Sequence, residues 1–231
     1  MKEFISQLDI KWPESAAEAV IVQKELGQKV QIKNNFKTLK IIAGVDCSYD
    51  IKNNLSHAYV VLMELDNLKP ITSTKAELPT TFPYIPGFLS FREIPVILEA
   101  LKLLPQKPNL FMVDGQGIAH PRRMGIAAHL GVLLDMPSIG VAKSRLTGVY
   151  KEPGFQKGNQ TPLMDKNEQI GTVLRSKDNV KPLFISPGHK VDNETAVKIV
   201  ERCLTRYKLP EPTRIADKIS KQPYRQNNLF E

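Results

Sequence analysis

The sequence predicts a single α/β domain built on a mixed sheet, and three patterns lead to that prediction. Three strand-like segments first follow one another with short connections, which is typical of an antiparallel meander. The apolar residues then change to three- and four-residue spacing, which indicates an amphipathic helix. Two more strand-like segments enclose a second helix, and a strand–helix–strand crossover of this length implies parallel pairing.

The strands expected in the meander are apolar and rich in β-branched residues. The first of them ends at Asp46, and Asp66 and Asn67 form a turn-like pair between the second and the third. Because the connections are short, strands that follow one another in the sequence are expected to pair in the sheet. The expected ranges are 39–46, 56–65 and 68–78.

The first long helix is indicated by apolar residues that recur from Ile94 to Leu104. Ser90 and Glu93 have the spacing of a capping box, which places the start of the helix at Ser90. Pro95 is then expected in or near the first turn, because a proline deeper in a helix removes a backbone hydrogen bond.

The rest of the chain alternates between strands and helices. Residues 1–30 form an N-terminal extension with a helical pattern near 16–26, and the polar stretch 150–167 is expected to be a surface loop. No linker, repeat or low-complexity tract divides the sequence, so we expect one domain over 1–231 with a basic tail at 221–231. The further expected strands are 109–113, 137–142, 169–175 and 182–186, and the further expected helices are 121–129, 192–207 and one from about 213.

Charge and cysteine content restrict the class of protein. Lys and Arg number 32 against 24 Asp and Glu, and a net charge of +8 favours an anionic partner, of which nucleic acid is the commonest in cells. The alternative is a basic surface that only aids solubility. Cys47 and Cys203 are too few for a disulfide framework or a four-cysteine zinc site. No secretory signal or membrane span is present, so we expect a cytoplasmic monomer with no membrane partner.

Two acids follow apolar strands and could form a metal site. If the strands that end at Asp46 and Asp114 are neighbours, both carboxylates emerge at the sheet end where open α/β sheets bind ligands. Close carboxylates repel, and a divalent cation relieves that repulsion; oxygen ligands favour Mg²⁺ or Mn²⁺ over zinc. Lys143, after the 137–142 strand, suits a phosphate or a structural ion pair. Turn and cap roles stay open as alternatives for the acids.

The four histidines carry less information. His57 is expected at the surface, and His129 near a helix end, where it would interact with the helix dipole. His120 is positioned either to cap a helix or to face a phosphate. His189 lies in a strand-to-helix loop, where a functional and a structural role are equally supported.

Six segments resemble the endonuclease V family, the deoxyinosine-specific nucleases. They occur in the family's order and spacing over about residues 38–220, whereas residues 1–30 and the tail contribute little. The most specific is the block Pro-Tyr-Ile-Pro-Gly followed by Phe-Arg-Glu. The six segments are Gly44–Asp46, Pro83–Glu93, Val113–Arg122, Gly140–Lys143, Gly188–His189 and Pro210–Asp217.

The resemblance implies a ribonuclease H-like fold, in which an antiparallel three-strand meander and parallel strands form one mixed sheet flanked by helices. It also implies Mg²⁺-dependent hydrolysis of the second phosphodiester bond on the 3′ side of a deaminated adenine, with Mn²⁺ as a substitute. The products carry 3′-hydroxyl and 5′-phosphate ends, and the role is DNA repair. Deoxyinosine-containing DNA is the expected substrate, and inosine-containing RNA is the alternative because animal members prefer RNA.

The catalytic residues follow from the same resemblance. Carried over by motif, Asp46, Glu93 and Asp114 are the metal-binding carboxylates, and Asp217 takes the family's fourth position. Lys143 becomes a cation for the phosphate or the transition state. Whether one or two metal ions take part stays open.

Damage reading is assigned to the loop between Pro83 and Pro86, where Tyr84 is expected to fill the gap left by an extruded base. The alternative is a packed aromatic turn. Glycines permit close backbone approach, so three of them are expected near the hypoxanthine base, and a histidine is expected to contact the strand. The expected substrate-binding residues are Pro83, Tyr84, Ile85, Pro86, Gly87, Gly115, His120 and Gly140.

Two other classes of protein share some of these features. A ribonuclease H-like resolvase or other structure-specific nuclease would have the acids and the fold but not the Pro-Tyr-Ile-Pro block. A non-catalytic nucleic-acid-binding domain would use the +8 charge alone, but acids near a phosphate would weaken its binding unless a cation were present. Neutralising Arg122 and Arg123 is expected to weaken the salt dependence of binding if this basic pair contacts the phosphate backbone.

Overall fold

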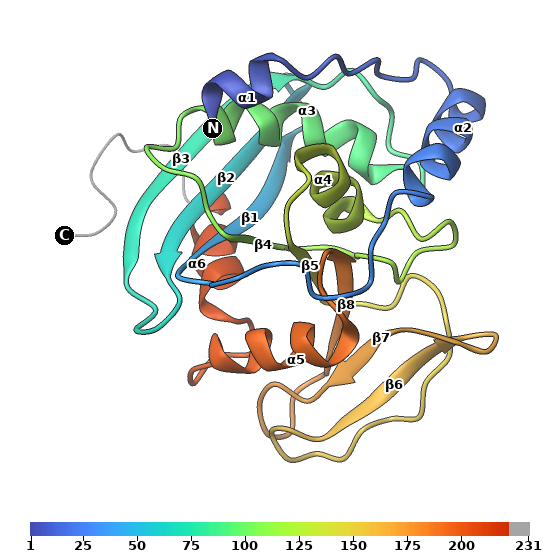
Figure 1. Cartoon of the computed structure of the whole chain (residues 1–231), viewed down its shortest axis with the longest axis vertical. Coiled ribbons are helices and arrows are strands. Elements are labelled where there is room, and N and C mark those ends of the chain that lie inside the picture. Colours follow the sequence, from blue (N-terminus) through green and yellow to red (C-terminus); the bar gives the residue numbers. More distant parts are fainter. Residues whose placement is uncertain (222–231) are drawn as a thin grey trace.

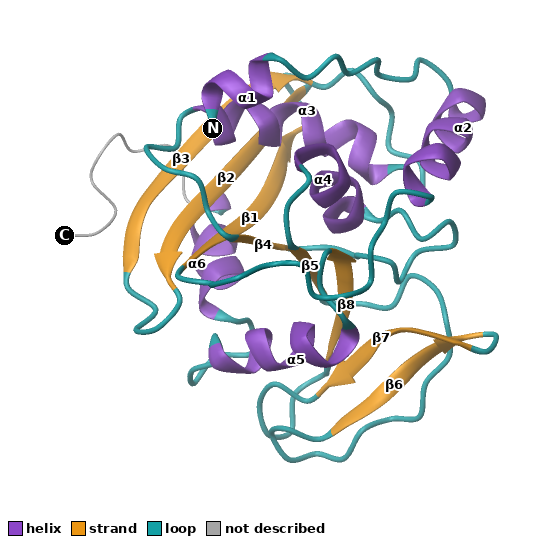
Figure 2. Cartoon of the chain, in the orientation of Figure 1, coloured by secondary structure: helices purple, strands orange, loops and turns teal. Residues whose placement is uncertain are grey.

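The computed structural model describes residues 1–221, and its centre is one eight-stranded sheet (Figures 1 and 2). The strands lie in the order β3-β2-β1-β4-β5-β8-β7-β6. They are β1 (Ile41–Asp50), β2 (Leu55–Glu64), β3 (Pro70–Pro79), β4 (Leu110–Val113), β5 (Ser138–Ala142), β6 (Gln160–Asp165), β7 (Glu168–Leu174) and β8 (Leu183–His189). The helices are α1 (Lys2–Ser6), α2 (Ala16–Gly27), α3 (Leu89–Lys102), α4 (Ile126–Leu134), α5 (Asn193–Arg202) and α6 (Glu211–Ser220).

The expected mixed sheet is confirmed. β1, β2 and β3 pair antiparallel as a meander, and β1, β4 and β5 pair in parallel. β8, β7 and β6 then extend the sheet with antiparallel pairs. Val45 lies opposite Val113 in the parallel pair, and the Asp114 amide donates to the Val45 carbonyl at 3.0 Å. The residues after these two valines, Asp46 and Asp114, are therefore brought side by side.

Helices cover both faces of the sheet (Figure 2). Because side chains alternate along a strand, Ala43 and Val45 of β1 pack in the core with α3 and α4, whereas Ile42 packs in the second core with α5. Gly44 is on the same face as Ile42, and there α6 lies against β1. A Cβ atom at Gly44 would come within 2.1 Å of the Pro212 carbonyl oxygen, so only glycine lets α6 approach this closely.

The start of α3 differs from the expectation. Phe88 is its N-cap residue, no side chain caps the helix, and Pro95 lies inside it rather than in the first turn. The predicted capping box is wrong because both of its side chains have partners elsewhere in the core. The Ser90 hydroxyl lies 2.9 Å from Nδ1 of His129, and Glu93 accepts a hydrogen bond from Tyr49.

Three further expectations need correction or lie outside the described residues. The helix expected at 121–129 is α4, which begins only at Ile126, so that His129 is buried in its middle and not near its end. The polar stretch 150–167 contains the edge strand β6, of which only Leu163 is buried. Of the expected basic tail, residues 222–231 are not described. Over residues 1–221, no helix is long and apolar enough to cross a membrane.

Candidate active site

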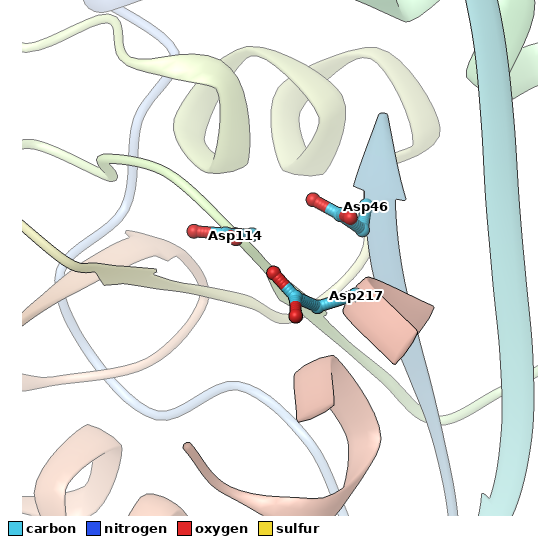
Figure 3. A group of neighbouring side chains, drawn as sticks. All are labelled: Asp46, Asp114 and Asp217. Atoms are coloured by element: carbon cyan, nitrogen blue, oxygen red, sulfur yellow. The ribbon is translucent and has the colours of Figure 1, made fainter. Parts of the chain in front are cut away.

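Three carboxylates converge at the centre of the sheet (Figure 3). Asp46 comes from β1, Asp114 follows β4, and Asp217 comes from α6. Each offers one oxygen, and these oxygens lie within 4.8 Å of one another. The parallel pairing of β1 with β4 brings the first two together, and the close approach of α6 at Gly44 adds the third.

Burial and charge repulsion act strongly on this acidic cluster. Burial, together with the neighbouring Asp114 and Asp217, raises the pKa of Asp46 to about 6, although a hydrogen bond with Ser220 opposes the change. Burial also favours a higher pKa for Asp217, but hydrogen bonds from Lys143 and Lys221 outweigh it and lower that pKa. The negative charge of Asp217 is therefore compensated by two lysines, whereas that of Asp46 is compensated less.

Lys143 directs its ammonium group into the cluster from the end of β5. Its Nζ atom lies 2.6 Å from an Asp217 oxygen and also contacts Asp114. Burial opposes the charge on Lys143, but these two hydrogen bonds raise its pKa. A cation thus already lies between two of the three carboxylates. Three hard oxygen donors around that position are the ligand set that Mg²⁺ or Mn²⁺ prefers, so the residues present fit a divalent metal ion.

Glu93 approaches from α3, on the other face of β1, and is not among the three clustered carboxylates. It accepts a 2.5 Å hydrogen bond from the Tyr49 hydroxyl, and Arg92 stacks 3.8 Å from the centre of the Tyr49 ring. Burial and the charges of Asp46 and Asp114 raise the pKa of Glu93 to about 8, against the hydrogen bond from Tyr49. The structure therefore separates the expected metal set into a trio that includes Asp217 and a buried, neighbouring Glu93.

The loop before α3 exposes Tyr84, whose accessible fraction is 66%. Behind it, the Phe88 amide donates to the Ile85 carbonyl at 3.0 Å, and Gly87 has a φ of +83°. Proline followed by a glycine of positive φ is the pattern of a type II turn. Pro83 and Pro86 are exposed, whereas Ile85 is half-buried. The aromatic ring thus projects from a turn whose backbone is fixed.

The other residues expected to bind substrate lie beneath or beside this loop. His120 is buried, its Nε2 lies 2.9 Å from the Gly87 carbonyl, and burial lowers its pKa to about 4. Gly115 and Gly140 are neighbours, because a Cβ at Gly140 would lie 2.6 Å from the Gly115 carbonyl. Backbone atoms fill the space beside Gly140. Gly87 is not next to these two glycines but lies beside the His120 ring.

Two histidines and a basic pair have internal partners. Nδ1 of His189 accepts from the Gln31 amide at 3.3 Å, which supports a structural role in β8. His57 is half-buried beside Glu77 rather than freely exposed. Arg123 is ion-paired, and Arg122 binds the loop before α3, so neither guanidinium is free of partners.

The sequence patterns did not reveal two residues that contact the expected site residues. Tyr49 donates to Glu93, and the side-chain amide of Gln23 donates to the Gly87 carbonyl at 2.9 Å. Tyr49 lies three residues after Asp46 in β1, on the alternate face, and its hydroxyl meets Glu93 only because α3 packs there. Strand alternation could have placed Tyr49 on that face, but not its partner. Gln23 gave no signal, since it lies in the N-terminal segment far from every motif.

The mixed sheet, the helices on both faces and the acidic cluster on the central strands define a nuclease of the ribonuclease H-like class. The family model for endonuclease V matches residues 24–218, and the chain belongs to the endonuclease V family. Endonuclease V of Rippkaea orientalis is 50% identical over 217 residues, which cover 94% of this chain and 95% of that protein.

Solved structures agree with this assignment. Endonuclease V of Streptomyces avermitilis has a TM-score of 0.86 and 40% identity, over 91% of this chain and 93% of that one. Endonuclease V of Ciona intestinalis, solved with a 23mer DNA that contains an inosine followed by a ribo-adenosine, has a TM-score of 0.79 and 33% identity, over 89% and 95% of the two chains. The expected fold, family and enzyme class are confirmed.

Proposed function

We propose that the chain is a Mg²⁺-dependent endonuclease that hydrolyses the second phosphodiester bond on the 3′ side of a deaminated adenine, leaving 3′-hydroxyl and 5′-phosphate ends. The observation that carries the proposal is the trio of carboxylates with Lys143 between two of them, in a chain of the endonuclease V family. A neighbour at 33% identity was solved with inosine-containing DNA, which supports deoxyinosine as the recognised lesion.

The residues suited to hold the metal are Asp46, Asp114 and Asp217, with Glu93 beside them. A divalent cation in such a site lowers the pKa of an attacking water and neutralises charge on the departing 3′ oxygen. Lys143 would stabilise the charge that builds on the non-bridging phosphate oxygens. Glu93, oriented by the Tyr49 hydroxyl, is placed to orient the water or to hold its proton.

Recognition is proposed to lie in the exposed loop from Pro83 to Gly87. Extruding a base costs a few kcal/mol, and the cost is lowest at a mispaired base such as hypoxanthine. Tyr84 would fill the gap and keep the base outside the duplex. The backbone at Gly87, Gly115 and Gly140, with His120, is proposed to border the bound nucleotide.

A basic groove continues from the metal site and offers a path for the strand. Asp217 lines it together with Tyr207, Lys208, Arg214, Lys218 and Lys221. Burial and the charges of Lys143 and Lys181 lower the pKa of Lys208, which indicates cations crowded beside the acids. Phosphates of a strand whose scissile bond lies at the acids would relieve that repulsion.

The decisive experiment is cleavage of matched strands that contain either inosine or adenosine, with Mg²⁺, with Mn²⁺ and with a chelator. We expect metal-dependent cutting of the inosine strand only, at the second phosphodiester bond on the 3′ side of the lesion. Cutting without metal, or equal cutting of both strands, would overturn the proposal. We also propose that the active enzyme is a monomer, which native mass measurement of the active species tests.

RNA is the second candidate substrate. The DNA in the Ciona intestinalis structure has a ribo-adenosine directly after the inosine. The same assay on inosine-containing RNA and DNA of one sequence ranks the two substrates. We propose DNA as the preferred one, with a role in DNA repair, and a higher kcat/KM on RNA would reverse that assignment.

A further inference from the structure

The carbonyl of Gly87, in the turn behind Tyr84, accepts hydrogen bonds from three side chains. The donors are Nε2 of Gln23 at 2.9 Å, Nε2 of His120 at 2.9 Å and the Arg122 guanidinium at 3.0 Å. A carbonyl oxygen has two lone pairs, and one or two partners normally satisfy it. Three donors on one loop carbonyl fix that point of the backbone far more firmly than satisfaction requires.

Gln23 of α2 links this contact to the rest of the molecule. It is fully buried, and its amide nitrogen also reaches the Met124 carbonyl at 3.4 Å. Its amide oxygen accepts from the Arg122 guanidinium, which stacks 4.4 Å from the centre of the Phe88 ring. One side chain thus joins α2, the loop and the segment before α4.

Apolar packing holds the same two segments together. Ala19 of α2 is buried in a small cluster with Phe82, Phe88 and Phe91, and Ile85 packs on it. Phe82 and Phe88 stand on either side of Tyr84 in the sequence, so α2 forms the floor of the loop while Tyr84 projects to solvent. Residues 1–30, which contribute little to the family resemblance, supply that floor.

We propose that Gln23 is a positioning residue for damage recognition, which holds the turn at Gly87 so that Tyr84 is presented in one orientation. The inference rests on the proposed recognition role of Tyr84. An aromatic side chain on a fixed loop loses little conformational entropy when it enters the duplex, and this raises the apparent affinity for the extruded state. Without Gln23 the Gly87 carbonyl would keep His120 and Arg122, but the Arg122 guanidinium would lose its own partner, so the loop would be held less firmly and part of its ordering would fall on each binding event.

A purely structural role for Gln23, attaching α2 to the body, is the competing explanation. It predicts that a Gln23 substitution and a Tyr84 substitution act independently. A positioning role predicts that they do not, because Gln23 would have no effect on recognition once the ring is absent. A double-mutant cycle distinguishes the two.

The variants are Gln23→Met, which keeps length and removes all three polar contacts, and Gln23→Glu, which keeps the acceptor for Arg122 but loses the donor to Gly87. Glu25→Met, at an exposed position of α2, is the matched control. Each is made in the wild-type and in the Tyr84→Ala background. We measure kcat and KM on double- and single-stranded inosine substrates, and amide hydrogen exchange over residues 82–88.

On the duplex, both Gln23 variants should raise KM by roughly five- to twentyfold with little change in kcat, and Glu25→Met should match the wild type. On the single strand, and in the Tyr84→Ala background, their effect should fall below about twofold. Amide exchange over 82–88 should accelerate in both. Additive effects with Tyr84→Ala, or unchanged exchange over the loop, would overturn the proposal. If Gln23→Met does not fold, Gln23→Glu gives the same cycle.

The experiment distinguishes failure of the proposed function from failure of the role proposed for Gln23. A wild-type protein that does not distinguish inosine from adenosine would remove the recognition role of Tyr84 and with it this inference. A wild type that distinguishes them, with Gln23 variants that keep the full duplex preference, would remove the inference alone.

Discussion

The acidic cluster and the loop around Tyr84 lie on one molecule but are built on opposite electrostatic principles. In the cluster, carboxylates are brought within 4.8 Å of one another, and burial with repulsion raises the pKa of Asp46 to about 6. In the loop, the buried polar groups of Gln23 and His120 are paired, and His120 stays neutral. The cluster keeps repulsion among its acids despite Lys143, whereas the polar groups of the loop already have partners.

On the proposed function, this difference separates chemistry from recognition. A site that stores charge repulsion attracts a divalent ion and responds to metal and pH. The loop is held by packed phenyl rings and by hydrogen bonds from an amide, a neutral imidazole and a guanidinium that stays charged, so it should respond to neither metal nor moderate pH change, and its role depends on geometry. Changes to the two regions should therefore affect different measurements.

The largest effect is expected from the acids. Asp114→Ala and Asp46→Ala should each reduce cleavage on the order of a thousandfold or more, because an oxygen ligand of the metal is lost. The fold should be retained, since removing one acid also removes repulsion. Cleavage rates and thermal unfolding check the two statements. Full turnover by Asp114→Ala would show that the trio is not the metal site.

Gly44 tests whether the packing of α6 positions the acids. Gly44→Ala would place a Cβ atom 2.1 Å from the Pro212 carbonyl, so α6 must move and carry Asp217 with it. We expect a loss of activity of about a hundredfold and a destabilisation of about 1–3 kcal/mol, the usual cost of overpacking. Urea unfolding and single-turnover cleavage measure both.

The control is Gly27→Ala at the end of α2, where a Cβ atom would make ordinary contact at 3.6 Å. It should leave activity and stability nearly unchanged. Equal behaviour of the two alanine variants would mean that α6 adjusts freely, and that Asp217 does not depend on this approach.

Tyr84 is the corresponding test of recognition. Tyr84→Ala removes stacking worth about 1–3 kcal/mol per base, so affinity for an inosine duplex should fall by roughly ten- to a hundredfold. The loss on an inosine single strand should be smaller, and the metal dependence should not change because no carboxylate has moved. An equal defect on both substrates would mean that the ring packs against the base or the site.

The pH dependence of stability should have opposite signs for two buried groups that lie outside both regions, Glu93 of α3 and His129 of α4. Burial raises the pKa of Glu93 to about 8, so its contribution is present at low pH and lost as pH rises from 4.5 through 8. Burial lowers the pKa of His129 to about 3, so its contribution is present above pH 6.5 and lost below it. Each group changes the free energy of unfolding by up to about 1.4 kcal/mol per pH unit.

Urea unfolding with a chelator isolates these contributions. Between pH 6.5 and 8, Glu93→Gln should flatten the decline in the free energy of unfolding. Between pH 6.5 and 5, His129→Gln should remove a fall as pH decreases. Profiles parallel to the wild type would mean that neither group titrates as its burial implies.

The smallest expected effect concerns salt. Lys208→Gln, in the basic groove, should reduce the slope of log K against log salt concentration by about 1. Arg123→Gln should leave that slope unchanged, because Asp165 and Glu168 already bind this guanidinium at 2.8 Å. A reduced slope for Arg123→Gln would place the strand on that side of the molecule instead.

What the sequence predicted correctly was determined by local pattern. Strand periodicity gave the meander and the parallel pair, and the adjacency of Asp46 and Asp114 followed from two neighbouring strands. Asp217 depended on the family resemblance, since nothing local shows that α6 lies on β1. The absence of a side chain at Gly44 permits this packing, and recognising that requires knowing that Pro212 lies there.

The errors arose where distant segments supply a partner. Ser90 and Glu93 have the spacing of a capping box, yet His129 and Tyr49 take their side chains. The edge strand β6 has three polar residues and a proline among its six residues and buries only Leu163, so its composition resembles that of a loop. Gln23 is one buried amide among surface residues of α2, and only the fold places it under Gly87.

The three clustered acids enter the polypeptide in the order Asp46, Asp114, Asp217, and α6 must lie on β1 before they meet. During translation the first two acids leave the ribosome long before the third. A nascent chain therefore carries two of the three acids, and a partly unfolded full-length chain carries all three without bringing them together. On the proposed function, the tight contact at Gly44 makes nuclease competence a late event in the life of each molecule, reached only when folding has joined its first strand to its last described helix.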